Sequence, residues 1–87
     1  MDRPAILPSA RKHGISDERM LHVVRMCPLA IEHPWRAGQV IYLGPDQYGV
    51  PLEVGAFEDD AGQLTIFHAM RMRPGYQEAY EEVMRWL

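Results

Sequence analysis

The hydrophobic residues in the first third of the chain recur with the spacing of a helix. The stretch begins at Ser16, a preferred N-cap residue, and two acidic residues follow it where a helix N-terminus favours negative charge. Pro28 closes the stretch, because proline cannot continue a helix. The apolar stripe consists of Met20, Val23, Val24 and Cys27. The pattern predicts a helix over residues 16–27.

The middle of the chain consists of short β-prone runs separated by turn residues. The best run, QLTIFHAM, is rich in β-branched and aromatic residues. The segments GPDQYG and EDDAG have the composition of turns. Strands are predicted at 40–43, 50–57 and 63–70, with a further short one at 29–34. Because the connections are short, these strands should pair antiparallel.

After Pro74 and Gly75 the spacing becomes helical again, and acidic residues lie opposite the apolar stripe. The stripe consists of Tyr76, Ala79, Tyr80, Val83 and Leu87. We therefore expect a helix that runs to the C-terminus. The order of elements predicts one α+β domain over residues 1–87, with a small antiparallel sheet of three to four strands packed with an N-terminal and a C-terminal helix. Residues 1–10 contain two prolines and are expected to be extended.

Composition narrows the classes of function. The chain has 87 residues, of which 47% are hydrophobic, as in a folded domain. We expect no signal peptide and no membrane-spanning segment. A lone cysteine suits a reducing cytoplasm. The net charge of −3 is unfavourable for binding nucleic acid, so any such function needs a local basic patch.

One candidate patch lies at the end of the predicted strand 63–70, where His68, Arg71 and Arg73 occur within six positions. Histidine can accept or donate a proton near neutral pH, and arginines stabilise charge on a phosphate, so the three could cleave RNA without a metal. Strict alternation, however, places His68 with Ile66 and Met70, and Arg71 on the other face. A bulge or the end of the strand would have to bring them together. Otherwise the histidine hydrogen-bonds a neighbour and both arginines are solvated.

Arg11, Lys12 and His13 form a second basic cluster, which could hold RNA phosphates or be a solvated flank. Glu53 and Tyr42 lie on neighbouring predicted strands and could add an acid–base group or a stacking surface. The four histidines are too widely scattered for a metal site, and no cofactor motif is present. Trp35 could anchor a partner or cap the open end of the core.

The segments RKHGIS (11–16) and TIFHAMRMR with the tyrosine-containing helix after it resemble the BrnT toxins, small RelE-like ribonucleases of bacterial toxin–antitoxin pairs. YLGPDQYGVPLEV and HAMRMRPGY are closer still to a group of short actinobacterial toxins. The resemblance covers residues 11–84. It implies an α+β fold, RNA cleavage in the cytoplasm and an antitoxin that binds the toxin. Met70 stands where the BrnT pattern has arginine, and His68 where it has a small residue.

Two hypotheses follow. In the first, the chain is a toxin-type endoribonuclease in which His68, Arg71 and Arg73 are catalytic, and Arg11, Lys12 and His13 bind RNA. In the second, it is a non-catalytic module that binds a protein partner through its sheet edge and Trp35, which suits the acidic composition better. Both hypotheses leave homo-oligomerisation open.

Overall fold

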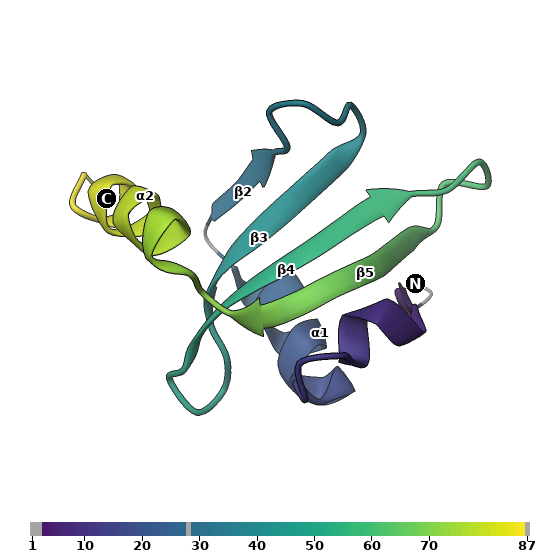
Figure 1. Ribbon diagram of the computed structural model, residues 1–87, viewed down its shortest axis with the longest axis horizontal. Helices are drawn as coiled ribbons and strands as arrows, with labels where there is room; N and C mark the ends of the chain where they lie inside the picture. Colours follow the sequence, from purple (N-terminus) through teal and green to yellow (C-terminus); the bar gives the residue numbers. More distant parts are fainter. Residues whose placement is uncertain (1–2, 28, 87) are drawn as a thin grey trace.

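The computed structural model describes residues 3–27 and 29–86. They form a mixed sheet of five strands and two α-helices, so the α+β class is confirmed. In chain order the elements are β1 (Ala5–Ile6), a 3-10 turn η1 (Pro8–Arg11), α1 (Asp17–Met26), β2 (Leu29–Glu32), β3 (Gln39–Pro45), β4 (Pro51–Glu58), β5 (Leu64–Arg71) and α2 (Pro74–Met84). Figure 1 shows the strands running diagonally, with α2 beside β2 and β3 and α1 behind the sheet.

The predicted N-cap of the first helix is confirmed, since the hydroxyl of Ser16 accepts a 3.3 Å hydrogen bond from the amide of Arg19. Helix α1 ends at Met26. The predicted closure by Pro28, the extreme N-terminal residues 1 and 2, and the last position of the C-terminal helix, Leu87, lie outside the described residues.

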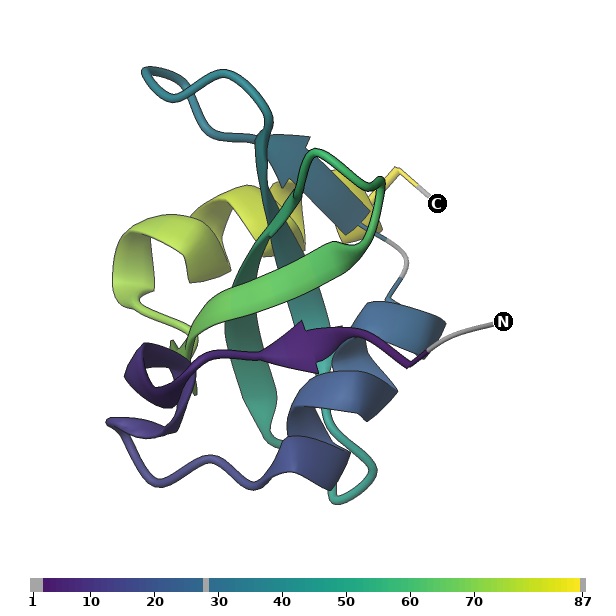
Figure 2. The same cartoon turned by 90° about the vertical axis from the view of Figure 1, so that its right-hand side faces the viewer.

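The two α-helices cover opposite faces of the sheet (Figure 2). Helix α1 buries Met20, Leu21 and Val23 against a cluster that includes Leu52 and Val54 of β4. Helix α2 packs Tyr76 and Tyr80 against a smaller cluster on the other face, which consists of Ile41, Leu43 and Met72. We call these the α1 face and the α2 face. Since α2 itself has no buried residue, the α2 face is only partly covered.

The sheet differs from the prediction in strand number and direction. Its order is β1-β5-β4-β3-β2, and β1 pairs parallel to β5 with Ala5 opposite Thr65. The segment 1–10, predicted to be only extended, therefore contributes a fifth strand and the turn η1. Two residues between prolines are too short for a periodic pattern, which is why this strand could not be predicted. The other four strands are antiparallel, as expected.

Alternation along β5 is interrupted by a bulge. Gly55 lies opposite His68, but the next residue, Ala56, lies opposite Ile66, so Phe67 is skipped in the register. The prediction that His68 shares a face with Ile66 is therefore wrong. Ile66 packs on the α1 face together with Ala69, whereas His68 projects from the α2 face.

Candidate active site

The centre of the candidate site is the carboxylate of Glu53, on the α2 face of the central strand β4. Its side chain is completely buried. His68 lies on the neighbouring strand β5, and its Nε2 is 2.9 Å from Oε2 of Glu53. Arg73, just beyond β5, donates from its backbone amide at 2.9 Å, from Nε at 3.0 Å and from Nη2 at 2.8 Å. One buried carboxylate thus joins the histidine to one of the two predicted arginines.

The charge on Glu53 is fixed by these contacts. Burial acts to raise the pKa of its carboxyl group, but the hydrogen bonds from the side chain and backbone of Arg73 and from His68 outweigh burial, and the pKa lies below its ordinary value. The pairing also raises the pKa of the Arg73 guanidinium. Because an ionised carboxylate can only accept, Nε2 of His68 donates to it, so Nδ1 is the ring nitrogen left to exchange a proton with a substrate.

Arg71 does not join this site. It lies opposite Leu52, a residue of the α1 face, and its side chain is exposed at the strand end. The bulge lies before His68, so it changes only the faces of the residues that precede the histidine. Normal alternation continues after it, and His68 and Arg71 therefore lie on opposite faces. Arg73 reaches Glu53 because the chain leaves the sheet after Arg71 and begins α2 with Arg73 as its N-cap residue.

His13 does join the site, although it comes from the predicted RNA-binding cluster. Its ring centroid is 5.9 Å from that of His68, with the rings edge to face. The turn η1 explains this approach. The hydroxyl of Ser9 donates a 2.7 Å hydrogen bond to the carbonyl oxygen of Phe67, and Ala10 is buried beneath the turn.

The other two members of that cluster are placed differently. Arg11 forms two hydrogen bonds of 2.9 Å with Asp17, which raise the pKa of Arg11 and lower the pKa of Asp17. Its guanidinium therefore pairs with the first residue of α1. Lys12 is exposed, one residue from His13.

Tyr42 lies outside the site, because it packs against the α1-face cluster, where burial and the charges of Cys27 and Glu58 raise its pKa. The thiol of Cys27 is half-buried, and burial raises its pKa as well. No cluster of three or more potential metal ligands occurs within residues 3–27 and 29–86. In the same part of the chain, neither α-helix has the length and apolarity that crossing a membrane requires.

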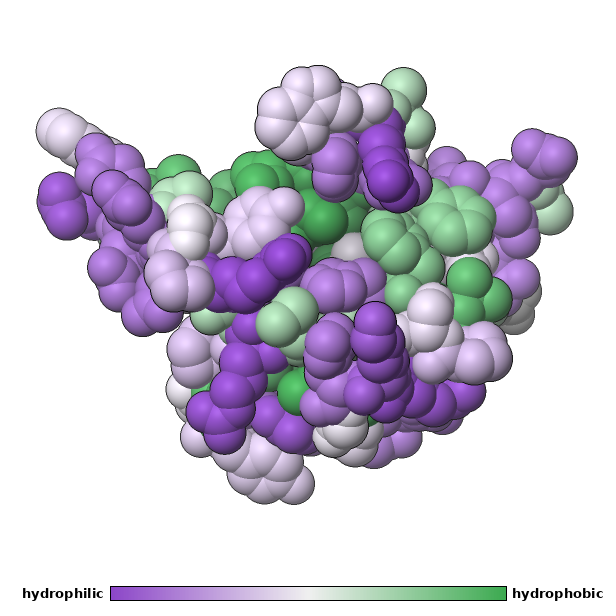
Figure 3. All heavy atoms as spheres, viewed as in Figure 1, coloured by the Kyte–Doolittle hydropathy of each residue, from purple (hydrophilic) through white to green (hydrophobic). Residues whose placement is uncertain are grey.

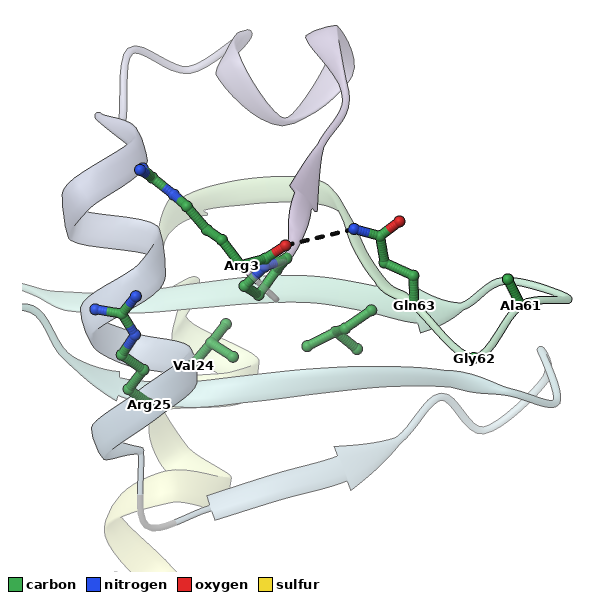
Figure 4. Close-up of a pocket in the computed structure, with 8 residues that line it drawn as sticks. Arg3, Val24, Arg25, Ala61, Gly62 and Gln63 are labelled. Atoms are coloured by element: carbon green, nitrogen blue, oxygen red, sulfur yellow. Dashed lines mark hydrogen bonds between the residues drawn. The ribbon is translucent and has the colours of Figure 1, made fainter. Parts of the chain in front are cut away.

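Two cavities lie outside the carboxylate cluster. The first, about 730 Å³, lies between β1, α1 and the β4–β5 turn and is lined in part by Arg3, Val24 and Arg25 (Figure 4). Arg3 extends along α1 to pair with Glu18 at 3.1 Å, so the two guanidiniums do not converge. The second, about 630 Å³, borders the site and lies between the β2 edge and the start of α2.

The sequence pattern indicates Glu53 only as an optional acid–base group, and it does not single out Phe57 or Phe67. A charged residue within the apolar run PLEVGAF is the available signal for Glu53. No protein-family model matches this chain, and neither the curated proteins nor the solved structures searched include a similar one.

Proposed function

We propose that this protein is a metal-independent endoribonuclease whose acid–base groups are His68 and His13. The observation that carries the proposal is the arrangement of Glu53, His68 and His13: a buried carboxylate fixes one imidazole, and a second imidazole lies 5.9 Å away. A carboxylate that holds a histidine in one tautomer and orientation is a recurring device of acid–base catalysis. Two adjacent histidines can serve as the base and the acid of one reaction.

The reaction that suits this pair is cleavage of RNA by its own 2′-hydroxyl. Nδ1 of His68 accepts the proton of the 2′-hydroxyl, whose oxygen attacks the adjacent phosphorus. The bond from phosphorus to the 5′-oxygen breaks, and protonated His13 gives its proton to that leaving oxygen. The products are a 2′,3′-cyclic phosphate and a free 5′-hydroxyl. The reaction as written therefore requires no metal ion and no oxidant.

In this proposal, Arg73 is the arginine that contacts the phosphate. Its bonds to Glu53 use Nε and Nη2, which leaves the third nitrogen, Nη1, outside the ion pair, and 55% of the side chain is exposed. A guanidinium N–H beside a phosphate oxygen stabilises the charge that develops in the transition state. Lys12, exposed beside His13, adds a second cation for the RNA backbone. Arg71, on the other face, has no part in the chemistry.

The biological setting that we propose comes from the resemblance to the BrnT toxins. The chain would act on RNA in the bacterial cytoplasm as the toxin of a toxin–antitoxin pair, and its partner would be a cognate antitoxin. The α+β class of the fold is compatible with this assignment. Expression of the chain alone should then inhibit growth, and co-expression with the product of the adjacent gene should relieve the inhibition.

Purified protein incubated with total RNA in the presence of EDTA tests the chemistry. Wild-type protein and the His22→Ala control, which removes a histidine of α1 on the other side of the sheet from Glu53, should both cleave RNA. His68→Ala and His13→Ala should each lose about a hundredfold or more in rate, since general acid–base groups contribute that much. Arg71→Ala should retain full activity. Equal cleavage by wild type and His68→Ala would remove the histidine from the mechanism.

A second candidate function, a protein-binding module, is favoured by one observation. Trp35 is 87% exposed in the β2–β3 connection, so the prediction that it caps the core is wrong. It follows shortly after β2, which is one of the two edge strands of the sheet, and an edge strand can accept a strand from a partner. RNA that stays intact with wild-type protein, together with a tight complex that Trp35→Ala weakens, would support this function instead.

A further inference from the structure

A row of four rings crosses the α2 face of the sheet and ends at the proposed catalytic pair. Phe57 and Phe67 have ring centroids 5.9 Å apart, Phe67 and His68 are separated by 6.5 Å, and His68 and His13 by 5.9 Å. Each separation lies within the range of interacting aromatic pairs. Residues from β4, β5 and the loop before α1 therefore form one continuous aromatic strip.

The bulge in β5 and the glycine opposite it create this strip. Because Phe67 is skipped in the register, its side chain joins that of His68 on the α2 face. Gly55 provides the space: a Cβ at that position would lie 3.0 Å from Cζ of Phe67 and 3.3 Å from Cβ of His68. The phenylalanine ring thus lies over the backbone of β4, where any other residue would displace it.

Part of the strip is open to solvent. Phe57 and Phe67 are each partly exposed, and neither belongs to the cluster that α2 covers. Figure 3 shows hydrophobic residues gathered in a hollow over β3 and beside it over β4 and β5, to the right of α2. Two partly exposed phenylalanines therefore lie in line with a histidine of the proposed catalytic pair.

We infer that Phe57 and Phe67 are a stacking platform for two bases of a single-stranded RNA whose scissile phosphate lies at His68 and His13. The inference rests on the proposed function. Every base has a π-face, so aromatic side chains beside a cationic groove bind single strands with little sequence preference. The cations are at the histidine end of the row, where Lys12 and Arg73 lie.

Charge also limits the length of the platform. Phe57 is followed by Glu58, the last residue of β4, and by Asp59 and Asp60 in the β4–β5 turn, and all three are exposed. Carboxylates at that end repel further phosphates, so the platform accommodates two stacked bases and no longer track. An acidic protein can then engage RNA through a short local site in spite of its net charge of −3.

Fluorescence anisotropy with a short single-stranded RNA tests the inference, provided that its 2′-hydroxyls are methylated so that it binds without being cleaved. Phe67→Leu and Phe57→Leu should each weaken binding about fivefold to a hundredfold, the range for loss of one stacked base. Phe57→Tyr keeps the ring and should bind like wild type. Trp35→Leu, the control at an exposed aromatic residue off the strip, should also bind like wild type. Unchanged affinity of both leucine variants would overturn the inference.

An abasic probe makes the test independent of whether a variant folds. Replacing one stacked nucleotide of the RNA by an abasic residue should weaken binding to the wild-type protein as much as Phe67→Leu does. The two changes together should be no worse than either alone, because both remove the same contact. Additive losses, or wild-type binding that does not respond to the abasic residue, would overturn the inference.

The same experiment separates this inference from the proposed function. The wild-type protein should bind the methylated RNA in a way that depends on the two phenylalanine rings, and it should cleave the unmethylated RNA. Ring-dependent binding by a wild-type protein that cleaves nothing would retain the platform and refute the nuclease. Cleavage with a KM that is the same in wild type, Phe57→Leu and Phe67→Leu would retain the nuclease and refute the platform.

Discussion

The carboxylate of Glu53 accepts hydrogen bonds from both the backbone amide and the guanidinium of Arg73, twenty residues away. The carboxylate is buried, whereas the guanidinium is about half exposed. This pair fixes the start of α2 to the centre of the sheet, and because the pKa of Glu53 is lowered, it gives His68 a charged neighbour at neutral pH. The asymmetry of burial between the two partners makes the pair directly testable.

Removing the exposed partner should be worse than neutralising the buried one. Arg73→Ala leaves the buried carboxylate without its main partner and should lower the free energy of unfolding by about 3 kcal/mol, the low end of the range for such a loss, because Arg73 itself is half exposed. Glu53→Gln removes that charge and should cost about 1–2 kcal/mol. The double variant should cost less than the sum of the two. Urea unfolding measures all three; Arg71→Ala, with a change below about 0.5 kcal/mol, is the matched control. Strictly additive costs would contradict this account of the pair.

Stability should fall in acid because of Glu53. Its pKa is lower in the folded protein than in the unfolded chain, so its contribution is complete above the unfolded value and is lost as the pH falls through the folded value. Urea unfolding between about pH 7 and pH 3 should show a decline that is shallower in Glu53→Gln. Asp46 has a lowered pKa too, since its hydrogen bonds with Arg19, Val50 and Tyr48 outweigh burial, so part of the decline should remain. An identical decline in wild type and variant would contradict the assignment.

Gly55→Ala should disturb the packing of the Phe67 ring against β4. The added methyl group would lie 3.0 Å from Cζ of that ring, so we expect a loss of about 1–3 kcal/mol in the free energy of unfolding. The double change with Phe67→Leu should recover part of the loss by making room. Gly75→Ala is the control, because no atom lies within 4 Å of its added carbon and α2 should gain about 0.5–1 kcal/mol. Equal changes in the thermal stability of Gly55→Ala and Gly75→Ala would contradict the proposed packing of Phe67 against Gly55.

Ser9→Ala should separate the two histidines without touching either. Loss of the 2.7 Å bond to Phe67 should cost about 1 kcal/mol in stability, because the carbonyl oxygen can take a water in its place. The cleavage rate should fall by more than this stability loss explains, since the turn η1 sets the position of His13. Ser9→Thr keeps the hydroxyl and should restore the rate. A rate equal to wild type in Ser9→Ala would show that the turn does not position His13.

The sequence alone predicts those helices and strands whose ends are marked by residues next to them in the chain. Ser16 and its two acidic followers set the start of α1, and glycine- and aspartate-rich turns separate β3, β4 and β5. The parallel pairing of Ala5 with Thr65 has no such signal, because it joins two residues across sixty positions. From the sequence alone, these two extended residues are therefore predicted only as part of a loose segment.

The site can be predicted only in part, for a similar reason. His68 and Arg73 are both expected from the sequence, but alternation cannot show that they meet at Glu53, since the bulge at Phe67 depends on the strand opposite. From the sequence alone, Glu53 is the polar member of an alternating strand, and nothing local shows that its side chain is buried and bonded to Arg73. His13 reaches the site through the docking of η1, a contact between residues far apart in the chain.

The pH dependence of RNA cleavage without metal tests the central claim most directly. If one imidazole is the base and the other the acid, kcat/KM of the wild-type protein should follow a bell-shaped curve. His13→Ala and His68→Ala should each lose one limb of the bell, and the two lost limbs should be opposite ones. A wild-type protein that fails to cleave RNA in EDTA, or a bell that persists unchanged in both variants, would contradict the assignment of these histidines.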